Sequence, residues 1–222
     1  MDIIHISRLQ KTSALFGIVG PVINTIVFAV LGSLYPGYNP ISQFISELAT
    51  SEAPHNIIMN ILGFNVFGLY LIFFGLGFYL SVKKHILTTI SMILFIVSGI
   101  CIFSLAAFPC DTGCKSLTFT GIGHNLLIKF PSVAMPTAIL LSLYPIWKDH
   151  NWRNYWWLFF LQIGIFLIIF SPIAIFIDLS LVDGLIQRLG LAVPLSWIFI
   201  MSTKLYRLAG KYMSLQLEPI IS

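Results

Sequence analysis

Long apolar runs alternate with short charged or turn-rich segments along the whole chain. Six of these runs are long enough to cross a bilayer as helices, which needs about 20 residues each. Turn clusters such as Tyr35-Pro36-Gly37 and charged breaks such as Lys83-Lys84 separate them. The pattern predicts an all-α polytopic membrane protein. It forms a single domain over residues 1–222, a bundle of six transmembrane helices with spans at about 13–34, 56–81, 86–109, 121–146, 155–178 and 184–206.

Charges between the runs fall on two sets of loops with opposite sign. If there are six spans, one side carries nine basic residues, namely Arg8, Lys11, Lys83, Lys84, Lys148, Arg153, Lys204, Arg207 and Lys211. The loops of the other side carry Glu47, Glu52, Asp111, Asp178 and Asp183, with Lys115 as their base. Because basic loops stay on the cytoplasmic side, we expect a multi-pass protein of the cell membrane with both termini cytoplasmic.

Two further expectations concern the first apolar run and the cytoplasmic boundary of the membrane. The first apolar run has no small-x-small cleavage site, so we expect it to remain in the protein as a signal anchor. Four tryptophans gather at the predicted cytoplasmic boundary, and they predict an aromatic belt that anchors the bundle, made of Trp147, Trp152, Trp156 and Trp157.

Composition narrows the class of partner. Charged residues make up 9% of the chain and mean hydropathy is +0.94, whereas soluble domains carry roughly 25% charged residues. Membrane lipids are therefore the expected partners. The net charge of +4 follows from the loop topology, so it does not indicate nucleic-acid binding. The spans show no inverted repeat, which disfavours a transporter.

A short interfacial helix is predicted in the first outer loop, within Asn39–Leu48. Asn39 is a suitable N-cap, Pro40 fits the first helical position, and the apolar residues recur at helical spacing. The helix either connects two spans along the membrane surface or closes the mouth of the bundle as a lid. In the second case Ser46 and Glu47 face a polar cavity.

Polar residues in the outer half of the membrane are the candidate functional residues, because ionisable side chains are costly in lipid. Lys129 lies about 12 Å inside the fourth span, and His124 lies at its start. Gln187 and Arg188 lie near the start of the sixth span. These residues either pair with nearby carboxylates, as Arg188 with Asp183 or Asp178 and Lys129 with Asp111, or they line an outer-leaflet pocket.

Three cysteines occur, of which Cys101 lies in an apolar run. Cys110 and Cys114 flank a three-residue segment that contains Gly113, and on an oxidising face they are able to form a disulfide. No other cysteine or histidine spacing resembles a zinc site, so no metal site and no cofactor are predicted.

Several short motifs occur in a familiar order: GIVGP at 17–21, PGYNPISQFISEL at 36–48, FPCD at 108–111, GIGH at 121–124 and GLIQRLG at 184–190. Through them the chain resembles the prokaryotic six-span membrane family catalogued as domain of unknown function 998. The resemblance covers nearly the whole chain, and it implies a fold without an established activity. Its implied polar positions are Ser46, Glu47, Asp111, His124, Gln187 and Arg188.

Three functions remain open on the sequence. In the first, the outer-leaflet pocket binds a lipid or isoprenoid amphiphile, with Ser46, Lys129, Gln187 and Arg188 as ligand-binding residues. In the second, the protein is an intramembrane acid–base enzyme, hydrolytic or lipid-modifying, with Glu47, Asp111 and His124 as catalytic residues. In the third, it is a structural or accessory membrane subunit whose polar residues only pair with one another.

Overall fold

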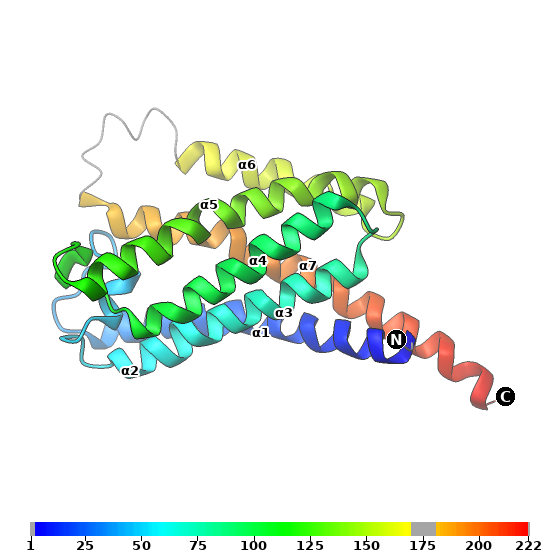
Figure 1. The fold of residues 1–222 in the computed structure, drawn as a ribbon, viewed down its shortest axis with the longest axis horizontal. Coiled ribbons are helices and arrows are strands. Elements are labelled where there is room, and N and C mark those ends of the chain that lie inside the picture. The colour runs from blue at the N-terminus through cyan, green and yellow to red at the C-terminus, as the bar shows by residue number, and fades with distance from the viewer. Residues whose placement is uncertain (1–2, 170–180, 222) are drawn as a thin grey trace.

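The computed structural model describes residues 3–169 and 181–221, and these residues form helices and loops without a strand (Figure 1). The long helices are α1 (Ile3–Leu34), α3 (Val66–Ser81), α4 (Ile86–Ser104), α5 (Phe119–Lys148), α6 (Leu158–Ile169) and α7 (Asp183–Ile221). The short α2 (Asn56–Ile58) and the π-helical η2 (Met59–Asn65) run directly into α3. Four 3₁₀ turns complete the set: η1 (Ile45–Ala49), η3 (Leu105–Ala107), η4 (Thr112–Cys114) and η5 (Arg153–Tyr155).

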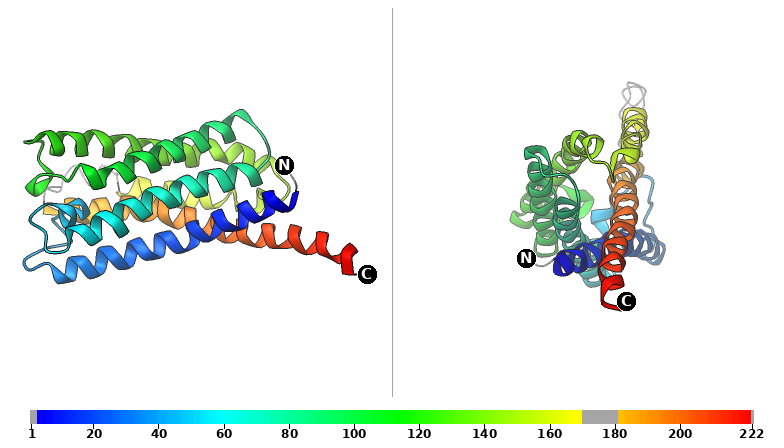
Figure 2. Two further views of the ribbon diagram at one scale, coloured as in Figure 1. Left: turned by 60° about the horizontal axis from the view of Figure 1, so that its bottom comes forward. Right: turned by 90° about the vertical axis from the view of Figure 1, so that its right-hand side faces the viewer.

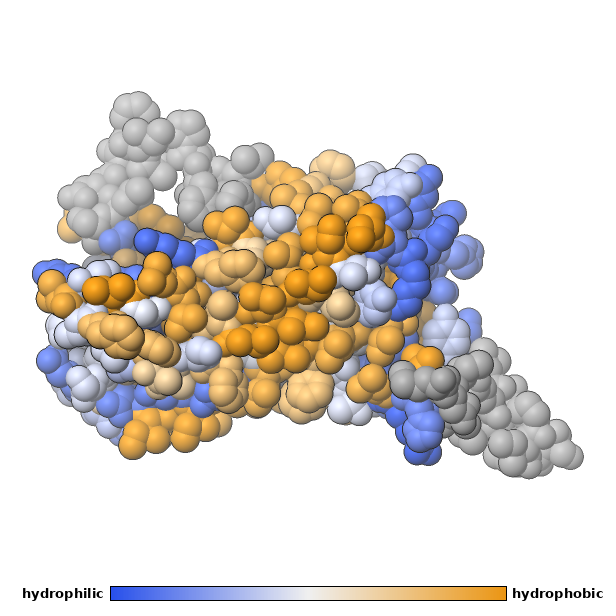
Figure 3. All heavy atoms as spheres, in the orientation of Figure 1, coloured by the Kyte–Doolittle hydropathy of each residue, from blue (hydrophilic) through white to orange (hydrophobic). Residues whose placement is uncertain are grey.

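The protein is a multi-pass membrane protein. Five helical segments of the described residues are long and apolar enough to span a bilayer: His5–Leu34, Asn56–Ser81, Ile86–Ala107, Phe119–Lys148 and Asp183–Ser214. On the face shown in Figure 3, an apolar band covers the middle of the bundle and hydrophilic residues gather toward both ends. The predicted fifth span is helical over Leu158–Ile169, and its part from residue 170 on, with Asp178, lies outside the described residues.

Span boundaries differ from the sequence-based ones mainly at the ends. The first helix begins at Ile3 and the last runs to Ile221, because charged and polar residues continue each helix beyond the apolar run. Both described ends of the chain therefore lie at the same end of the bundle (Figure 1). The opposite end holds the loops 35–55 and 108–118 and the start of α7. We call it the acidic end, after Glu47, Glu52, Asp111 and Asp183.

Helix α1 packs between α3 and α7, while α4 lies between α3 and α5 (Figure 2). Small residues on α1 make this close approach feasible, as is usual between membrane helices. A Cβ atom on Gly17 would overlap the Ser202 side chain, and one on Gly20 would overlap the Tyr70 ring. The aromatic core beside them consists of Phe74, Phe78, Phe95, Trp152 and Trp197.

A π-helical turn interrupts the second span. In such a turn the hydrogen bonds run from i to i+5, which accommodates one extra residue and weakens the regular ladder. The amide of Asn24 donates to the carbonyl oxygens of Leu62 at 3.1 Å and Gly63 at 2.9 Å. A buried side chain of α1 thus supplies hydrogen bonds to the backbone within this turn.

The helix predicted within the first outer loop is shorter and lies deeper than expected. Residues 40–42 form a turn, and the helical segment is the 3₁₀ helix η1 from Ile45 to Ala49. All five of its residues are buried, so it packs into the end of the bundle instead of lying in the membrane interface. Burial of η1 disagrees with the surface connector. It agrees with the lid interpretation in position only, because Glu47 bonds to the loop itself and the cavity that Ser46 lines is apolar.

Three of the four tryptophans expected in the aromatic belt have the exposure that an anchoring role requires, and the fourth does not. Trp147, Trp156 and Trp157 are about half exposed, as membrane-anchoring rings are. Trp152 is fully buried, and its indole N–H donates to the carbonyl oxygen of Ser81 at 3.3 Å and to its hydroxyl at 3.2 Å. This residue belongs to the core because the turn after α5 folds back over the end of α3.

Candidate functional site: a fastened loop over an apolar cavity

The first loop at the acidic end is stabilised by its own polar side chains. Asn39 accepts the N–H of Ile41 through its side-chain oxygen at 2.9 Å, which closes one turn. The carboxylate of Glu47 accepts the N–H of Phe44 at 2.9 Å and the side-chain amide of Gln43 at 3.1 Å. Through these bonds Glu47 caps η1. Its side chain is buried and does not face an open cavity.

Arg188 of α7 binds the same loop through its guanidinium group. Its guanidinium donates to the carbonyl oxygens of Pro40 at 2.7 Å and Gln43 at 2.9 Å, and to Gly184 of its own helix at 2.9 Å. It also donates to the hydroxyl of Tyr38. These are charge-assisted hydrogen bonds, which are stronger than bonds between neutral groups. Arg188 therefore binds the carbonyl groups of the loop, and Asp183 is not among its hydrogen-bond partners within the described residues.

Tyr38 connects Arg188 to a further carbonyl group of the loop. Its hydroxyl donates to the carbonyl oxygen of Phe44 at 2.9 Å. Burial raises the pKa of the Tyr38 phenol, although the neighbouring Arg188 acts in the opposite direction. The phenol consequently remains protonated at neutral pH and keeps its donor role. Tyr38 was not among the residues predicted from the sequence, although it directly precedes the Asn39-Pro40 turn.

The beginning of α7 makes two further bonds to the loop. The side-chain oxygen of Gln187 accepts the N–H of Ile45 at 2.6 Å, and the N–H of Leu185 donates to the carbonyl oxygen of Ile41 at 2.8 Å. Gly184 permits this close approach, because a Cβ atom there would lie 2.1 Å from the Gln43 carbonyl oxygen. The segment GLIQR at 184–188 thus binds the loop from Tyr38 to Ile45.

The second loop at the acidic end is organised by Asp111. Its carboxylate accepts the N–H groups of Leu117 and Thr118 at 2.8 and 2.9 Å and the hydroxyl of Thr118 at 2.7 Å. These bonds, the Thr118 hydroxyl first, lower the pKa of Asp111 below its ordinary value. Thr118 in turn caps α5 through the N–H of Gly121. The geometry gives Asp111 a loop-capping role at the entry to α5.

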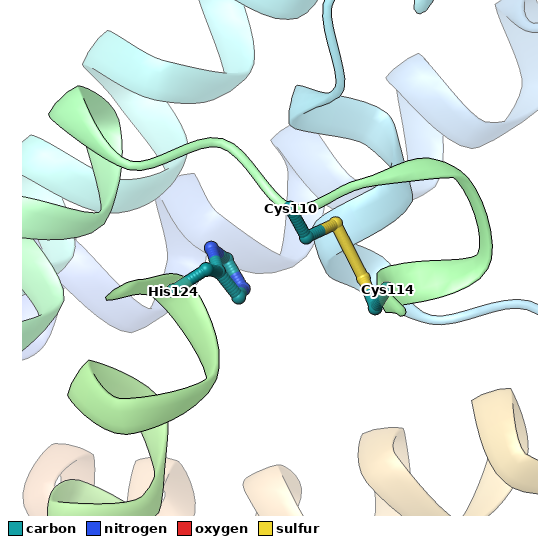
Figure 4. A group of neighbouring side chains, drawn as sticks. All are labelled: Cys110, Cys114 and His124. Atoms are coloured by element: carbon teal, nitrogen blue, oxygen red, sulfur yellow. A yellow bond between two sulfur atoms is a disulfide. The ribbon is translucent and has the colours of Figure 1, made fainter. Parts of the chain in front are cut away.

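His124 lies one turn further along α5, beside the two cysteines (Figure 4). Its side chain is buried, and its Nδ1 lies 2.8 Å from the carbonyl oxygen of Phe108. Cys110 and Cys114 are joined as a disulfide with a Cα–Cα separation of 4.9 Å. The Cys110 sulfur lies 3.4 Å from the carbonyl oxygen of Ser46, so the two loops of the acidic end meet here.

An apolar cavity of about 350 Å³ lies beneath η1 in the same half of the bundle. Its polar lining side chains are Ser46, Ser132 and Gln187. The remaining lining residues are apolar and come from α1, η1, η2, α3, α4, η3, α5 and α7; they are Phe28, Ile45, Phe64, Phe67, Ile102, Leu105, Ile128, Pro131, Met135, Pro136, Ile186, Gly190, Leu191 and Pro194. Such a lining suits a hydrocarbon chain with one polar end.

A second apolar cavity of about 290 Å³ continues sideways from the first, between α5, α6 and α7. The two share Ser132, Pro136, Gly190 and Pro194 as common lining. Pro136 and Pro194 have no N–H, so the carbonyl groups of Ser132 and Gly190 lack their usual helical donors. The shared border therefore carries two backbone acceptors. Gly190 was not among the residues predicted from the sequence; the available signal was Pro194, which follows it by four residues as Pro136 follows Ser132.

Lys129 does not join the group around the cavity. Its side chain is exposed on α5, and it lines neither of the two apolar cavities described above. The carboxylate of Asp111 bonds to Leu117 and Thr118 and not to Lys129, with which it was expected to pair. The structure thus brings Ser46, Glu47, Asp111, His124, Gln187 and Arg188 to one end of the bundle and leaves Lys129 apart.

A family model described as "Protein of unknown function (DUF998)" matches residues 18–204. The chain belongs to this family. The match includes both loops of the acidic end and the whole of the cavity lining, so these features lie within the DUF998 region. No curated protein and no solved structure matches the chain.

Proposed function

We propose that this DUF998 protein binds an amphiphile, a lipid or isoprenoid compound, in the cavity beneath η1. The observation that carries the proposal is the cavity itself: about 350 Å³, lined almost entirely by apolar side chains, with Ser46 and Gln187 near the loop. An apolar chain would fill the interior and gain roughly 0.8 kcal/mol for each buried CH₂ group. A polar headgroup would lie near Ser46 and Gln187.

The route of entry follows from the second cavity. Because the two cavities share their border at Gly190 and Pro194, a chain is able to enter sideways between α5 and α7 without unfolding the loop. The hydrogen bonds that Gln187 and Arg188 make with the loop then keep η1 in place over the ligand. We further propose that the acidic end faces outward, because the basic residues predominate at the other end.

The acid–base alternative has less support from the geometry. Glu47 and Asp111 both use their carboxylates to cap backbone N–H groups, and His124 is bonded to Phe108. Within the described parts of the chain, no hydrogen bond joins any two of the three proposed catalytic residues. A general acid and base need to reach one substrate atom together, so we propose binding in preference to catalysis.

The decisive experiment fills the cavity at Gly190. A Cβ atom at this position meets nothing within 4 Å, and the residue lines both cavities. Gly190→Phe therefore adds volume where the ligand would lie. Gly210→Phe is the matched control, because Gly210 is on the same helix, has equal space around it and lines neither cavity.

Each protein is purified in mild detergent, and the retained lipids are extracted and quantified by mass spectrometry. We expect the wild type and Gly210→Phe to retain the same lipid, and Gly190→Phe to retain at least about tenfold less. Thermal unfolding establishes that both variants are folded. Equal retention by a folded Gly190→Phe, or a wild-type protein without bound lipid, would contradict the proposal and leave a structural role as the better interpretation.

A further inference from the structure

We infer that Cys110, Cys114 and His124 form a binding site for a thiophilic divalent cation, with Zn²⁺ as the best match, when the two cysteines are reduced. One ligand atom from each of the three residues lies within 4.8 Å of the other two (Figure 4). This site is separate from the apolar cavity, and the inference does not depend on the proposed binding of an amphiphile.

The orientation of the histidine is that of a metal ligand. Its Nδ1 lies 2.8 Å from the carbonyl oxygen of Phe108, a group that only accepts hydrogen bonds. Nδ1 therefore carries the proton, and Nε2 keeps its lone pair. Histidines that bind metals through one ring nitrogen generally donate the other N–H to a carbonyl or carboxylate, which fixes the ring. Among the described residues Nε2 has no hydrogen-bond partner.

The cysteine loop keeps its shape by means other than the disulfide. Asp111 binds the N–H groups of Leu117 and Thr118, and the amide of Asn125 donates to the carbonyl oxygen of Cys114 at 3.1 Å. Gly121 lets Asp111 approach α5, since a Cβ atom there would lie 2.0 Å from the carboxylate. Both cysteines consequently remain next to His124 after reduction.

Ligand chemistry favours zinc. The segment Cys110-Asp111-Thr112-Gly113-Cys114 has the C-x₃-C spacing within the usual C-x₂₋₄-C range of zinc sites. Two thiolates and one neutral imidazole balance the charge of a divalent ion, which suits a site with Cys110 and His124 buried beside the membrane. Three protein ligands leave the fourth tetrahedral position for water.

Metal and disulfide exclude each other. Zn²⁺ binding replaces the two thiol protons and forms two metal–sulfur bonds without any change of oxidation state. Thiol–disulfide exchange with an external disulfide instead joins Cys110 to Cys114, and the external disulfide takes up the two electrons and two protons as a pair of thiols. The oxidised form has no thiolate left to bind the ion.

The test uses the full chain in detergent, reduced with a phosphine and freed of metal. Zn²⁺ binding is measured by competition with a chromophoric chelator, and Co²⁺ is added separately because its thiolate complexes absorb in the near ultraviolet. Cys114→Ser removes one ligand at a partly exposed position. Cys101→Ser is the control, because it removes the free cysteine elsewhere in α4.

We expect reduced wild type and Cys101→Ser to bind Zn²⁺ alike and to show the cobalt–thiolate absorption. Reduced Cys114→Ser is expected to bind at least about tenfold more weakly, and oxidised wild type is expected not to bind. His124→Ala is expected to weaken binding while thermal unfolding reports whether it is folded. Equal binding by Cys114→Ser and wild type, binding by the oxidised protein, or a cobalt complex without thiolate absorption would each overturn the inference.

Discussion

The side-chain oxygen of Gln187 accepts the backbone N–H of Ile45 at 2.6 Å, although 142 residues separate the two. This bond joins the first residue of η1 to the opening turns of α7. Arg188 adds bonds to Pro40 and Gln43 directly beside it. The loop and α7 therefore behave as one unit, and movement of the loop away from the cavity requires several bonds to break together.

Arg188 is expected to be important for stability in a way that other basic residues of α7 are not. Arg188→Leu leaves the carbonyl groups of Pro40 and Gln43 without their donor, and hydrogen bonds to charged groups contribute about 1.5–3 kcal/mol each. The control is Arg207→Leu, since Arg207 is exposed on the same helix. Thermal unfolding in detergent should show a clear decrease for Arg188→Leu only. Equal unfolding temperatures would contradict the role given to Arg188.

Gly184 is expected to tolerate no side chain. In Gly184→Ala the new Cβ atom would lie 2.1 Å from the Gln43 carbonyl oxygen and 2.7 Å from that of Pro40, both backbone atoms. Overpacking of this kind costs about 1–3 kcal/mol. Gly190→Ala, with open space around its Cβ, should instead stabilise α7 by about 0.5–1 kcal/mol. Opposite shifts in the unfolding temperature of the two variants would confirm this contrast, and shifts of the same sign would not.

The carboxylate of Asp111 makes the stability of the second loop depend on pH. Hydrogen bonds from Thr118 and Leu117 lower its pKa in the folded protein below the ordinary value of 3.8. As the pH falls through 3.8, the unfolded chain takes up the proton first, so the free energy of unfolding decreases until the folded pKa is passed.

Asp111→Asn is the matching variant, because its side chain carries no titrating group. We expect it to be less stable than wild type at about pH 6 and to differ less from wild type at about pH 3. Thermal unfolding of both proteins at the two pH values measures this. A difference that stays constant between the two pH values would show that the charge of Asp111 is unimportant.

Trp152 is expected to behave as a core residue and not as a membrane anchor. It is fully buried against Phe78 and Tyr155 and donates to Ser81. Trp152→Ala should therefore destabilise the protein by about 3–5 kcal/mol. Trp157→Ala is the control, because Trp157 is 53% exposed. Similar unfolding temperatures for the two variants in detergent would contradict this distinction.

The bundle was largely predictable from the sequence, because apolar length and alternating polarity follow directly from the bilayer. The first loop was not. Ile41, Phe44, Ile45 and Leu48 have helical spacing, but α7 takes up three carbonyl groups at the start of the segment. Arg188 binds those of Pro40 and Gln43, and Leu185 binds that of Ile41. Tertiary hydrogen bonds thus override a local helical preference.

The candidate site was predictable in its membership but not in its roles. The polar residues of the motifs do gather at one end, yet each carboxylate is used to cap a loop. Lys129 shows why depth along a helix is insufficient, since exposure depends on which face a residue occupies. The proximity of His124 to the cysteine pair follows from the approach of a loop to glycines of α5, which a pattern of single residues does not reveal.

The wide turn at Met59–Asn65 has a consequence for how this protein tolerates changes in length. A π-type turn arises when one residue is inserted into an α-helix, and its removal restores a regular helix without rotating the flanking parts. Deletion of a single residue is therefore accommodated within this turn. Deletion of a residue near the start of α3 (Val66–Ser81) would instead rotate every later side chain of that helix by about 100°. Phe74 and Phe78 would then turn out of the core.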